Sequence, residues 1–182
     1  AYSEKYSKEL LTLYMLSAFP IWNDGDYDRK DAILSYNAKL ANNLGNLVNR
    51  VVVLSLKLEK STLEQNSLLN SLPFQGKEAA DATKKLFTQY NLKWVLDTSF
   101  EHLDTLNKYA DEKQPWTLIK TDEEGTREVL YTLAEWLRQV GLALYPFFPE
   151  KMTEMFEKLG LKGYESQLEA GGLNKLLEKQ ET

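Results

Sequence analysis

The sequence predicts an all-α fold, a helical bundle of about five main helices. Over most of the 182 residues, apolar residues recur at steps of three or four, which is the spacing of amphipathic helices. The alternation of apolar and polar residues that is typical of strands is almost absent. With 43% hydrophobic residues, the chain is long enough to bury a core, so we expect a folded domain rather than a disordered chain.

The first two expected helices flank a turn. Residues 4–16 form the first, and a proline at position 20 prevents its continuation, because the residue before a proline avoids the helical region. The second runs from residue 29 or 31 to 58, with Asp28 or Asp31 as its N-cap. Its apolar stripe comprises Ile33, Tyr36, Leu40, Leu44, Leu47, Val51, Leu54 and Leu58.

Three further helices follow a mixed connector at residues 61–76. The third helix is expected from residue 77 or 78 to about 113, with a possible break near 91 or 97, and Pro115 stops it. The fourth is expected from Thr126, after Gly125, to about residue 144. The fifth covers 150–159 and is closed by Gly160.

Composition argues against several classes of function. The chain has no cysteine and one histidine, which removes disulfides and thiolate chemistry and makes a transition-metal site improbable. The acids between residues 24 and 31 do not match a calcium-loop pattern, so we expect no metal site. His102 has no recognisable nucleophile partner and no phosphate-binding loop occurs, so we expect no catalytic residues.

Charge and hydropathy indicate where the protein works. The net charge is -5, whereas proteins that bind nucleic acid without sequence preference usually carry a basic surface. Any nucleic-acid partner must therefore be bound locally, by a small number of side chains that face its bases. We find no apolar run of membrane-spanning length and no signal-peptide pattern. We expect a cytoplasmic protein, or a fragment of one, with no membrane partner.

One helical segment carries an unusual density of asparagine. Residues 36–51 read YNAKLANNLGNLVNRV, with five asparagines beside the apolar stripe. At ~100° per residue, Asn46 and Arg50 project about 40° apart on one flank, with Asn43 close by. Asn42 and Asn49 point further away and are interpreted as solvated bystanders. For each residue alone, a solvated helix face is the simpler interpretation.

The four tryptophans differ in their expected roles. Trp94 and Trp136 fall near apolar helical positions and are predicted to lie in the core, whereas Trp22 anchors a connector. Trp116 directly follows Pro115 at the end of a helix. From position alone, packing is its first interpretation, and a platform for an unstacked base is the second.

Three motifs together resemble a known family. They are the asparagine-rich segment, LNKYADEKQPW at residues 106–116 and LRQVGLALYPFFPEKMTEMFEKLGL at residues 137–161. In this order and spacing they resemble the C-terminal α-helical anticodon-binding domain of methionyl-tRNA synthetase, a class I aminoacyl-tRNA synthetase. The resemblance covers roughly residues 6–161.

The resemblance implies a function for particular residues. In this family an Asn and an Arg one helical turn apart, and a Trp after a Pro, recognise the anticodon; these positions are Asn46, Arg50, Trp116 and Pro115 here, with Asn43 as a supporting residue. The implied partner is the CAU anticodon loop of methionine tRNAs. Asn and Arg offer hydrogen bonds to base edges, and an indole face stacks on a base.

The resemblance also implies an organisation in three parts. Residues 1–30 would be a lead-in helix and connector from the catalytic half, 31–161 the anticodon-binding bundle, and 162–182 a C-terminal tail with a peripheral helix. The KYSKE segment at residues 5–9 looks like the family's KMSKS catalytic loop, but in the family that loop lies well upstream of the segment that these residues match. We therefore expect a chain without catalysis or cofactors of its own, whose parent ligase would use ATP and Mg²⁺ and would supply the catalytic domain as a second partner.

Two alternatives remain open at this point. One is the corresponding domain of another class I synthetase, which the set of Asn46, Arg50 and Trp116 argues against. The other is a helical module that binds a protein partner through its apolar faces. Scattered or buried positions for these three side chains would favour the interaction module.

Overall fold

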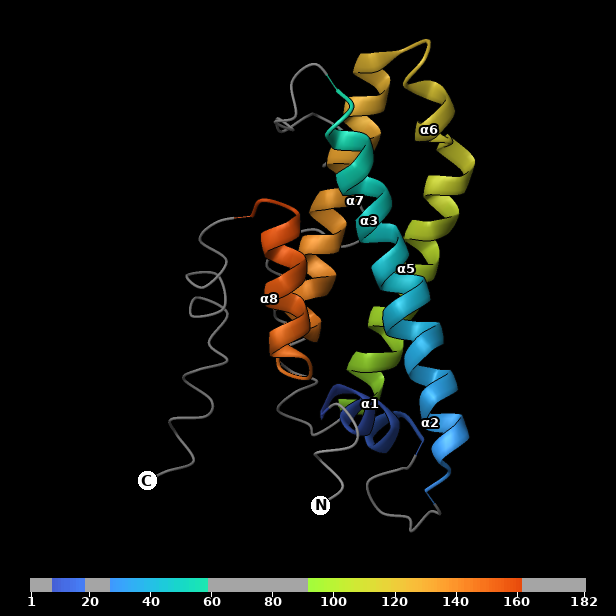
Figure 1. Cartoon of the computed structure of the whole chain (residues 1–182), viewed down its shortest axis with the longest axis vertical. Coiled ribbons are helices and arrows are strands. Elements are labelled where there is room, and N and C mark those ends of the chain that lie inside the picture. Colours follow the sequence, from blue (N-terminus) through green and yellow to red (C-terminus); the bar gives the residue numbers. More distant parts are fainter. Residues whose placement is uncertain (1–7, 19–26, 59–91, 162–182) are drawn as a thin grey trace.

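The described residues of the protein, 8–18, 27–58 and 92–161 of a computed structural model, are almost entirely helical (Figure 1). The first helices are α1 (Lys8–Ala18), α2 (Arg29–Tyr36), the π-helix η2 (Asn37–Gly45) and α3 (Asn46–Ser55). They are followed by α5 (Leu92–Lys113), α6 (Pro115–Leu118), α7 (Glu123–Leu144) and α8 (Pro149–Lys158). The all-α bundle predicted from apolar spacing is confirmed. The predicted connector at 61–76, the turn near residue 24, Trp22 and the C-terminal tail lie outside the described residues.

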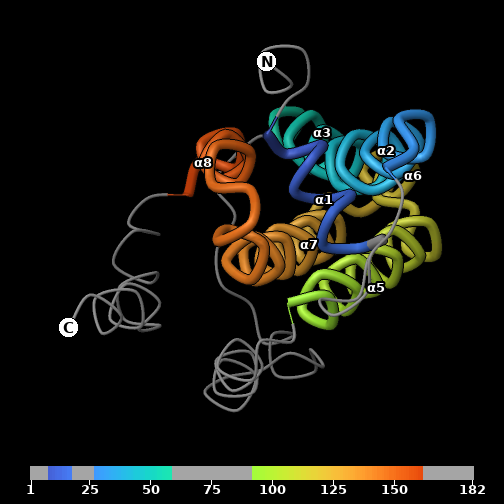
Figure 2. Tube along the Cα trace, turned by 90° about the horizontal axis from the view of Figure 1, so that it is seen from below, coloured from blue at the N-terminus to red at the C-terminus, as the bar shows by residue number. Residues whose placement is uncertain are grey.

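Helix α7 is the central element of the bundle. It contacts α3, α5, α6 and α8, and in the end-on view α8, α3 and α5 lie along one side of it (Figure 2). Its inner face buries Leu130, Leu133, Leu137 and Leu144 almost completely. Burying a side chain of this size contributes roughly 1.5–3 kcal/mol, so α7 anchors the core.

Helix α1 closes one end of the bundle. It packs on α2 and α5, and its residues Leu10 and Tyr14 form a small cluster with Ala32 of α2. Leu13 of α1 is fully buried in the main core. The predicted division at residue 30 lies close to the start of α2 at Arg29, where the side chain of Asp28 accepts the backbone N–H groups of Lys30 and Asp31 as an N-cap.

The long second helix differs from the prediction in its middle. Instead of one regular α-helix, the nine residues of η2 are wound as a π-helix between α2 and α3. Tyr36, Gly45 and Asn46 at the joints all have α-helical dihedral angles, so the three segments run on as one continuous rod. Three buried apolar residues, Leu40, Leu44 and Val48, recur at steps of four across the π segment.

Two further elements correct the sequence prediction. Helix α7 begins at Glu123 rather than Thr126, because the side chain of Asp122 accepts the backbone N–H of Gly125 (2.9 Å) and caps the helix before the glycine. The short helix α6 was not predicted. A helix of one turn between two long helices is too short to show a helical period of apolar residues in the sequence.

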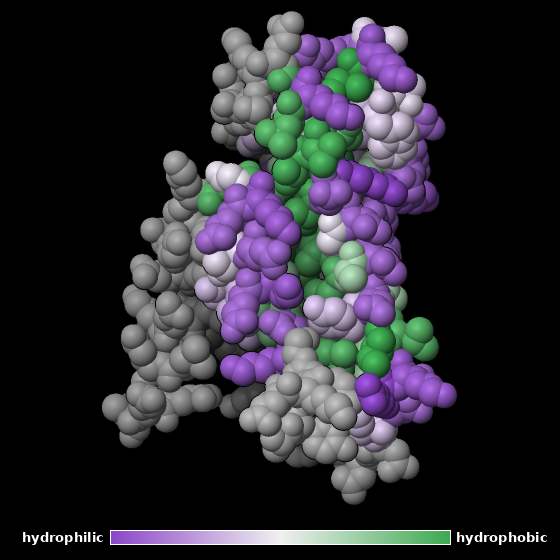
Figure 3. Space-filling view, viewed as in Figure 1, coloured by the Kyte–Doolittle hydropathy of each residue, from purple (hydrophilic) through white to green (hydrophobic). Residues whose placement is uncertain are grey.

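A band of apolar side chains is visible on one face, between α8 and the rod formed by η2 and α3 (Figure 3). It is the floor of a groove of about 380 Å³ that includes Leu40, Leu44, Val48, Val52 and Met155. On the α8 side, Glu154 bonds both Lys151 and Lys158, at 3.1 and 2.7 Å. The groove is therefore apolar at its base, with paired charges along one edge.

Candidate nucleic-acid interface

The backbone between α5 and α6 places Trp116 on the surface. Helix α5 ends at Lys113, and Gln114 adopts the left-handed region with φ of 46°. Pro115 then occupies the first turn of α6, where its missing N–H costs nothing. Pro115 is buried, whereas Trp116 beside it remains 38% exposed. The proline thus fixes the turn and leaves the indole at the surface.

Arg50 of α3 lies over this indole. The central carbon of its guanidinium is 5.6 Å from the centroid of the Trp116 ring, within the range of a cation–π interaction. The arginine side chain is 48% exposed, so the contact forms in water. Two residues that are 66 positions apart, and that the sequence analysis selected together, are in contact.

Asp111 completes a polar cluster with Arg50. Its carboxylate accepts a hydrogen bond from the Arg50 Nη1 at 3.3 Å. A hollow of about 360 Å³ opens at this point, lined by Asn49, Arg50, Val53, Leu54, Asp111 and Trp116. This volume is at the lower end of the range for small-molecule sites, and the hollow is open to solvent. It combines an indole face, a guanidinium and a carboxylate.

The other selected residues have different positions. Asn46 is exposed on α3, one turn before Arg50, but does not line the hollow. Asn49, which was interpreted as a solvated bystander, is exposed and lines the hollow. Asn49 also lines the groove beside α8, at the point where the two hollows meet on α3.

Asn43 contacts helix α5, as Arg50 does seven residues later. Its Nδ2 donates to Asp104 (2.7 Å), and its Oδ1 accepts from the Nδ2 of Asn107 (2.5 Å). Asn43 and Arg50 thus both contact the face of α5 that carries Asp104 and Asp111.

Two residues of the hollow, Asp111 and Val53, were missed by the sequence analysis. A signal for Asp111 was present, because Asp104, Asn107 and Asp111 are spaced by three and four and therefore share one face of α5. A polar stripe on a helix is most often a solvated face, so its spacing alone does not reveal a partner on another helix.

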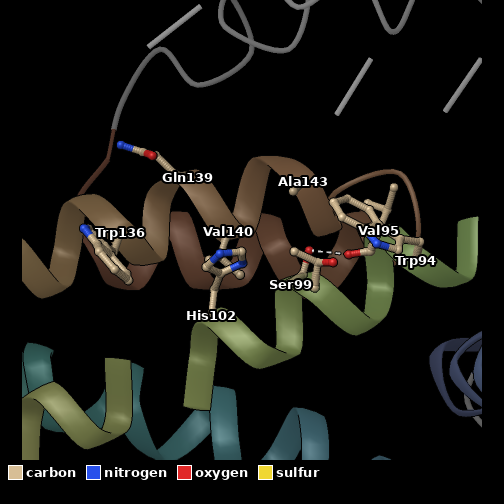
Figure 4. Close-up of a pocket in the computed structure, with 9 residues that line it drawn as sticks. Trp94, Val95, Ser99, His102, Trp136, Gln139, Val140 and Ala143 are labelled. Atoms are coloured by element: carbon tan, nitrogen blue, oxygen red, sulfur yellow. Dashed lines mark hydrogen bonds between the residues drawn. The ribbon is translucent and has the colours of Figure 1, made fainter. Parts of the chain in front are cut away.

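A second pocket lies between α5 and α7 (Figure 4). It contains Trp94, His102 and Trp136, but its volume of about 40 Å³ suits water rather than a ligand. Burial lowers the pKa of His102, which favours the neutral form of its imidazole. Trp136 is buried as predicted, whereas Trp94 is 45% exposed, and its predicted place in the core was wrong.

No other chemical centre is found in the described part of the chain. Within residues 8–18, 27–58 and 92–161, no cluster of three or more acids and histidines could hold a metal ion. In the same ranges no helix is both long and apolar enough to cross a membrane. The hollow beside Trp116 is therefore the strongest candidate site on the described surface.

Comparison with known proteins gives a consistent result. Residues 1–52 match the family model described as tRNA synthetases class I (M). The chain is 33% identical over 168 residues to a methionine–tRNA ligase of Bacillus subtilis, and this alignment covers 87% of the chain and 25% of that protein. It is 29% identical over 164 residues to the methionine–tRNA ligase of Fusobacterium nucleatum, covering 87% of this chain and 26% of that protein.

A solved structure shares the fold. The apo form of Mycobacterium tuberculosis methionyl-tRNA synthetase superposes with a TM-score of 0.79 at 24% identity, over 94% of this chain and 36% of that one. The chain thus spans about a quarter of the curated relatives named above. The resemblance read from its three motifs extends over most of its length.

Proposed function

We propose, on the premise that this chain resembles methionine–tRNA ligases over most of its length, that it reads the CAU anticodon of methionine tRNAs. The observation that carries the proposal is the contact of Arg50 with the partly exposed indole of Trp116 at the edge of an open hollow. A stacking surface and a hydrogen-bonding side chain in one place are what recognition of single-stranded RNA requires. The parent protein would be a ligase, and this chain a non-catalytic part of it.

The chemistry of the hollow supports binding of an unstacked base. The indole of Trp116 supplies a flat apolar face, and base stacking on an aromatic side chain is worth about 1–3 kcal/mol. The Arg50 guanidinium beside the indole would then bond the edge or the phosphate of the stacked nucleotide. Asn46, one turn earlier on α3, adds an amide with both donors and acceptors.

Charge sets the expected strength of binding. With a net charge of -5, the chain gains little from general attraction to phosphates, so affinity depends on the few groups at the hollow. We expect weak, salt-sensitive binding by this chain and stronger binding by the parent protein. The proposed contact uses no metal or cofactor, and ATP and Mg²⁺ would act in the catalytic domain of the parent.

Titration with two RNA stem–loops tests the proposal. One carries the CAU anticodon and the other differs in the anticodon alone; the full 182-residue chain should prefer CAU. Equal binding of the two would overturn the CAU assignment. Preference for the anticodon of another amino acid would identify the domain of a different class I synthetase, and no RNA binding at all would favour the interaction module.

Replacing Arg50 by alanine separates base contacts from phosphate contacts. We expect Arg50→Ala to weaken binding of the CAU loop by about 1–3 kcal/mol, the usual value of a specific arginine–base contact, and to affect the altered loop less. Fluorescence titrations of both loops against both proteins measure the difference. Equal losses for the two loops would show that Arg50 contacts only the backbone.

Replacing Asp111 by asparagine should have the opposite effect on RNA affinity. The carboxylate holds Arg50 and repels phosphates, so Asp111→Asn is expected to tighten binding of both loops, by about two- to fivefold, the range of an exposed ion pair. Glu112→Gln, next to it in sequence and exposed, removes the same charge from a residue that pairs with Lys108 instead. If both variants gain equally, the effect is one of net charge and does not pass through Arg50.

A further inference from the structure

The rotation of α3 about its axis decides whether Arg50 faces Trp116. Because α2, η2 and α3 form one continuous rod, the winding of η2 sets the direction in which the side chains of α3 point. A π-helix turns less per residue than an α-helix, and over nine residues this difference accumulates. If η2 were wound as an α-helix, Arg50 would point elsewhere.

An amide clasp joins η2 to α5 at the middle of this segment. Asn43 donates to Asp104 and accepts from Asn107. Asn107 also lies 3.0 Å from the Leu103 carbonyl of its own helix and 3.4 Å from the backbone carbonyl of Asn43. The clasp therefore contacts both the side chain and the main chain of the π segment.

The clasp and the Arg50 ion pair share one register. Asn43 and Asp104 are 61 residues apart in sequence, and so are Arg50 and Asp111. The two polar contacts are thus seven residues apart on each element, which requires the rod and α5 to run in the same direction. Figure 1 shows both ascending together.

Gly45 supports the same winding from within the rod. A Cβ added at this position would lie 3.3 Å from the backbone carbonyl oxygen of Leu40, five residues earlier. Such a contact is tight, and the obstructing atom is the main-chain acceptor around which a π turn closes. The absence of a side chain at residue 45 therefore favours the π winding.

We propose that Asn43 and Asn107 are positioning residues whose clasp holds η2 in its π winding and so sets the rotation of α3 that brings Arg50 over Trp116. They act through Arg50 and do not themselves touch RNA. The functional consequence rests on the proposed anticodon reading, whereas the effect on the position of Arg50 does not.

The first measurement is made without RNA. The ring current of an indole changes the chemical shift of a guanidinium proton that lies above its face. The chemical shift of Arg50 Hε in Trp116→Ala therefore gives the reference value for a protein in which the contact is lost. We expect Asn43→Ala and Asn107→Ala to move the Arg50 signal toward that value. Asn42→Ala, an exposed neighbour on η2, should leave the signal unchanged.

A charge-swapped pair separates positioning from general loss of stability. Asn43→Asp alone would place two carboxylates together and break the clasp. Combining it with Asp104→Asn restores one donor facing one acceptor at unchanged net charge, while Asn107 can still donate. The double variant should recover the Arg50 signal. If each single variant unfolds, Gly45→Ala tests the winding independently and should shift the same signal.

The second measurement is binding of the CAU stem–loop. Asn107→Ala is expected to weaken it about three- to tenfold, the effect of losing one or two hydrogen bonds, and the charge-swapped pair should regain the affinity. An unchanged Arg50 signal in Asn43→Ala, Asn107→Ala and Gly45→Ala would overturn the positioning role. A different outcome would separate the two proposals. If the Arg50 signal shifts in these variants but neither Arg50→Ala nor Trp116→Ala changes RNA binding, the proposed function is overturned and the positioning role of Asn43 and Asn107 stands.

Discussion

Trp116→Ala is expected to weaken binding of the CAU stem–loop by about 1–3 kcal/mol, the usual cost of removing an aromatic platform under a base. The side chain is only partly buried, and it belongs to a single-turn helix at the surface of the bundle. Its removal should therefore change RNA affinity more than the free energy of unfolding. Titration of the full chain with the stem–loop, together with urea unfolding, measures both quantities.

Trp94→Ala is the matched control for this experiment. Trp94 is also an exposed tryptophan, but it lies on α5 in the pocket shared with α7 and does not line the hollow. It should leave affinity for RNA unchanged. If both variants bind the stem–loop as the unmodified chain does, the indole of Trp116 has only a packing role, which its position in the sequence also allowed.

Most of the bundle could be predicted because its helices follow the apolar period closely. The stop at Lys113, the N-cap at Asp28 and the closing Gly160 with φ of 68° each arise from a local rule. The π winding of η2 could not be predicted in the same way. Apolar residues at steps of four fit one face of an α-helix as well as a π segment, and the contacts that distinguish them come from α5.

The candidate site was predictable only in part, for a similar reason. The pairing of Arg50 with Trp116 came from the resemblance to a family, since no spacing rule relates residues on different helices. Asp111 has a partner that only the folded bundle supplies. Trp94 was misplaced because its neighbours Val95 and Leu96 are buried, and one residue of rotation on a helix changes a core position into a surface one.

Phe156→Ala is expected to destabilise the fold by about 3–5 kcal/mol, because it removes a fully buried aromatic ring. The ring is fully buried between α7 and α8 and stacks on Tyr145, with centroids 6.5 Å apart. Its removal leaves a cavity beside the central helix. Urea unfolding followed by circular dichroism measures the loss as a lower midpoint at a similar slope.

Gly141 explains why the two helices approach so closely there. A Cβ at this position would lie 2.6 and 2.9 Å from the Cε1 and Cζ of Phe156 and would also collide with the methyl group of Met155. Gly141→Ala alone should therefore cost about 1–3 kcal/mol through overpacking. In the Phe156→Ala background the ring is gone and the added methyl group fills part of the cavity. The double variant should be more stable than the sum of the single changes predicts, by about 0.5–3 kcal/mol.

Leu13→Ala provides the comparison for this cycle. Leu13 is equally buried, but it lies on α1, which packs on α2 and α5. Its effect is expected to add to that of Gly141→Ala, because Leu13 is not among the side chains nearest to a Cβ added at Gly141. Additivity in both pairs would mean that the clash at Gly141 is relieved by Met155 alone, since the end of a methionine side chain can move aside more easily than a packed aromatic ring.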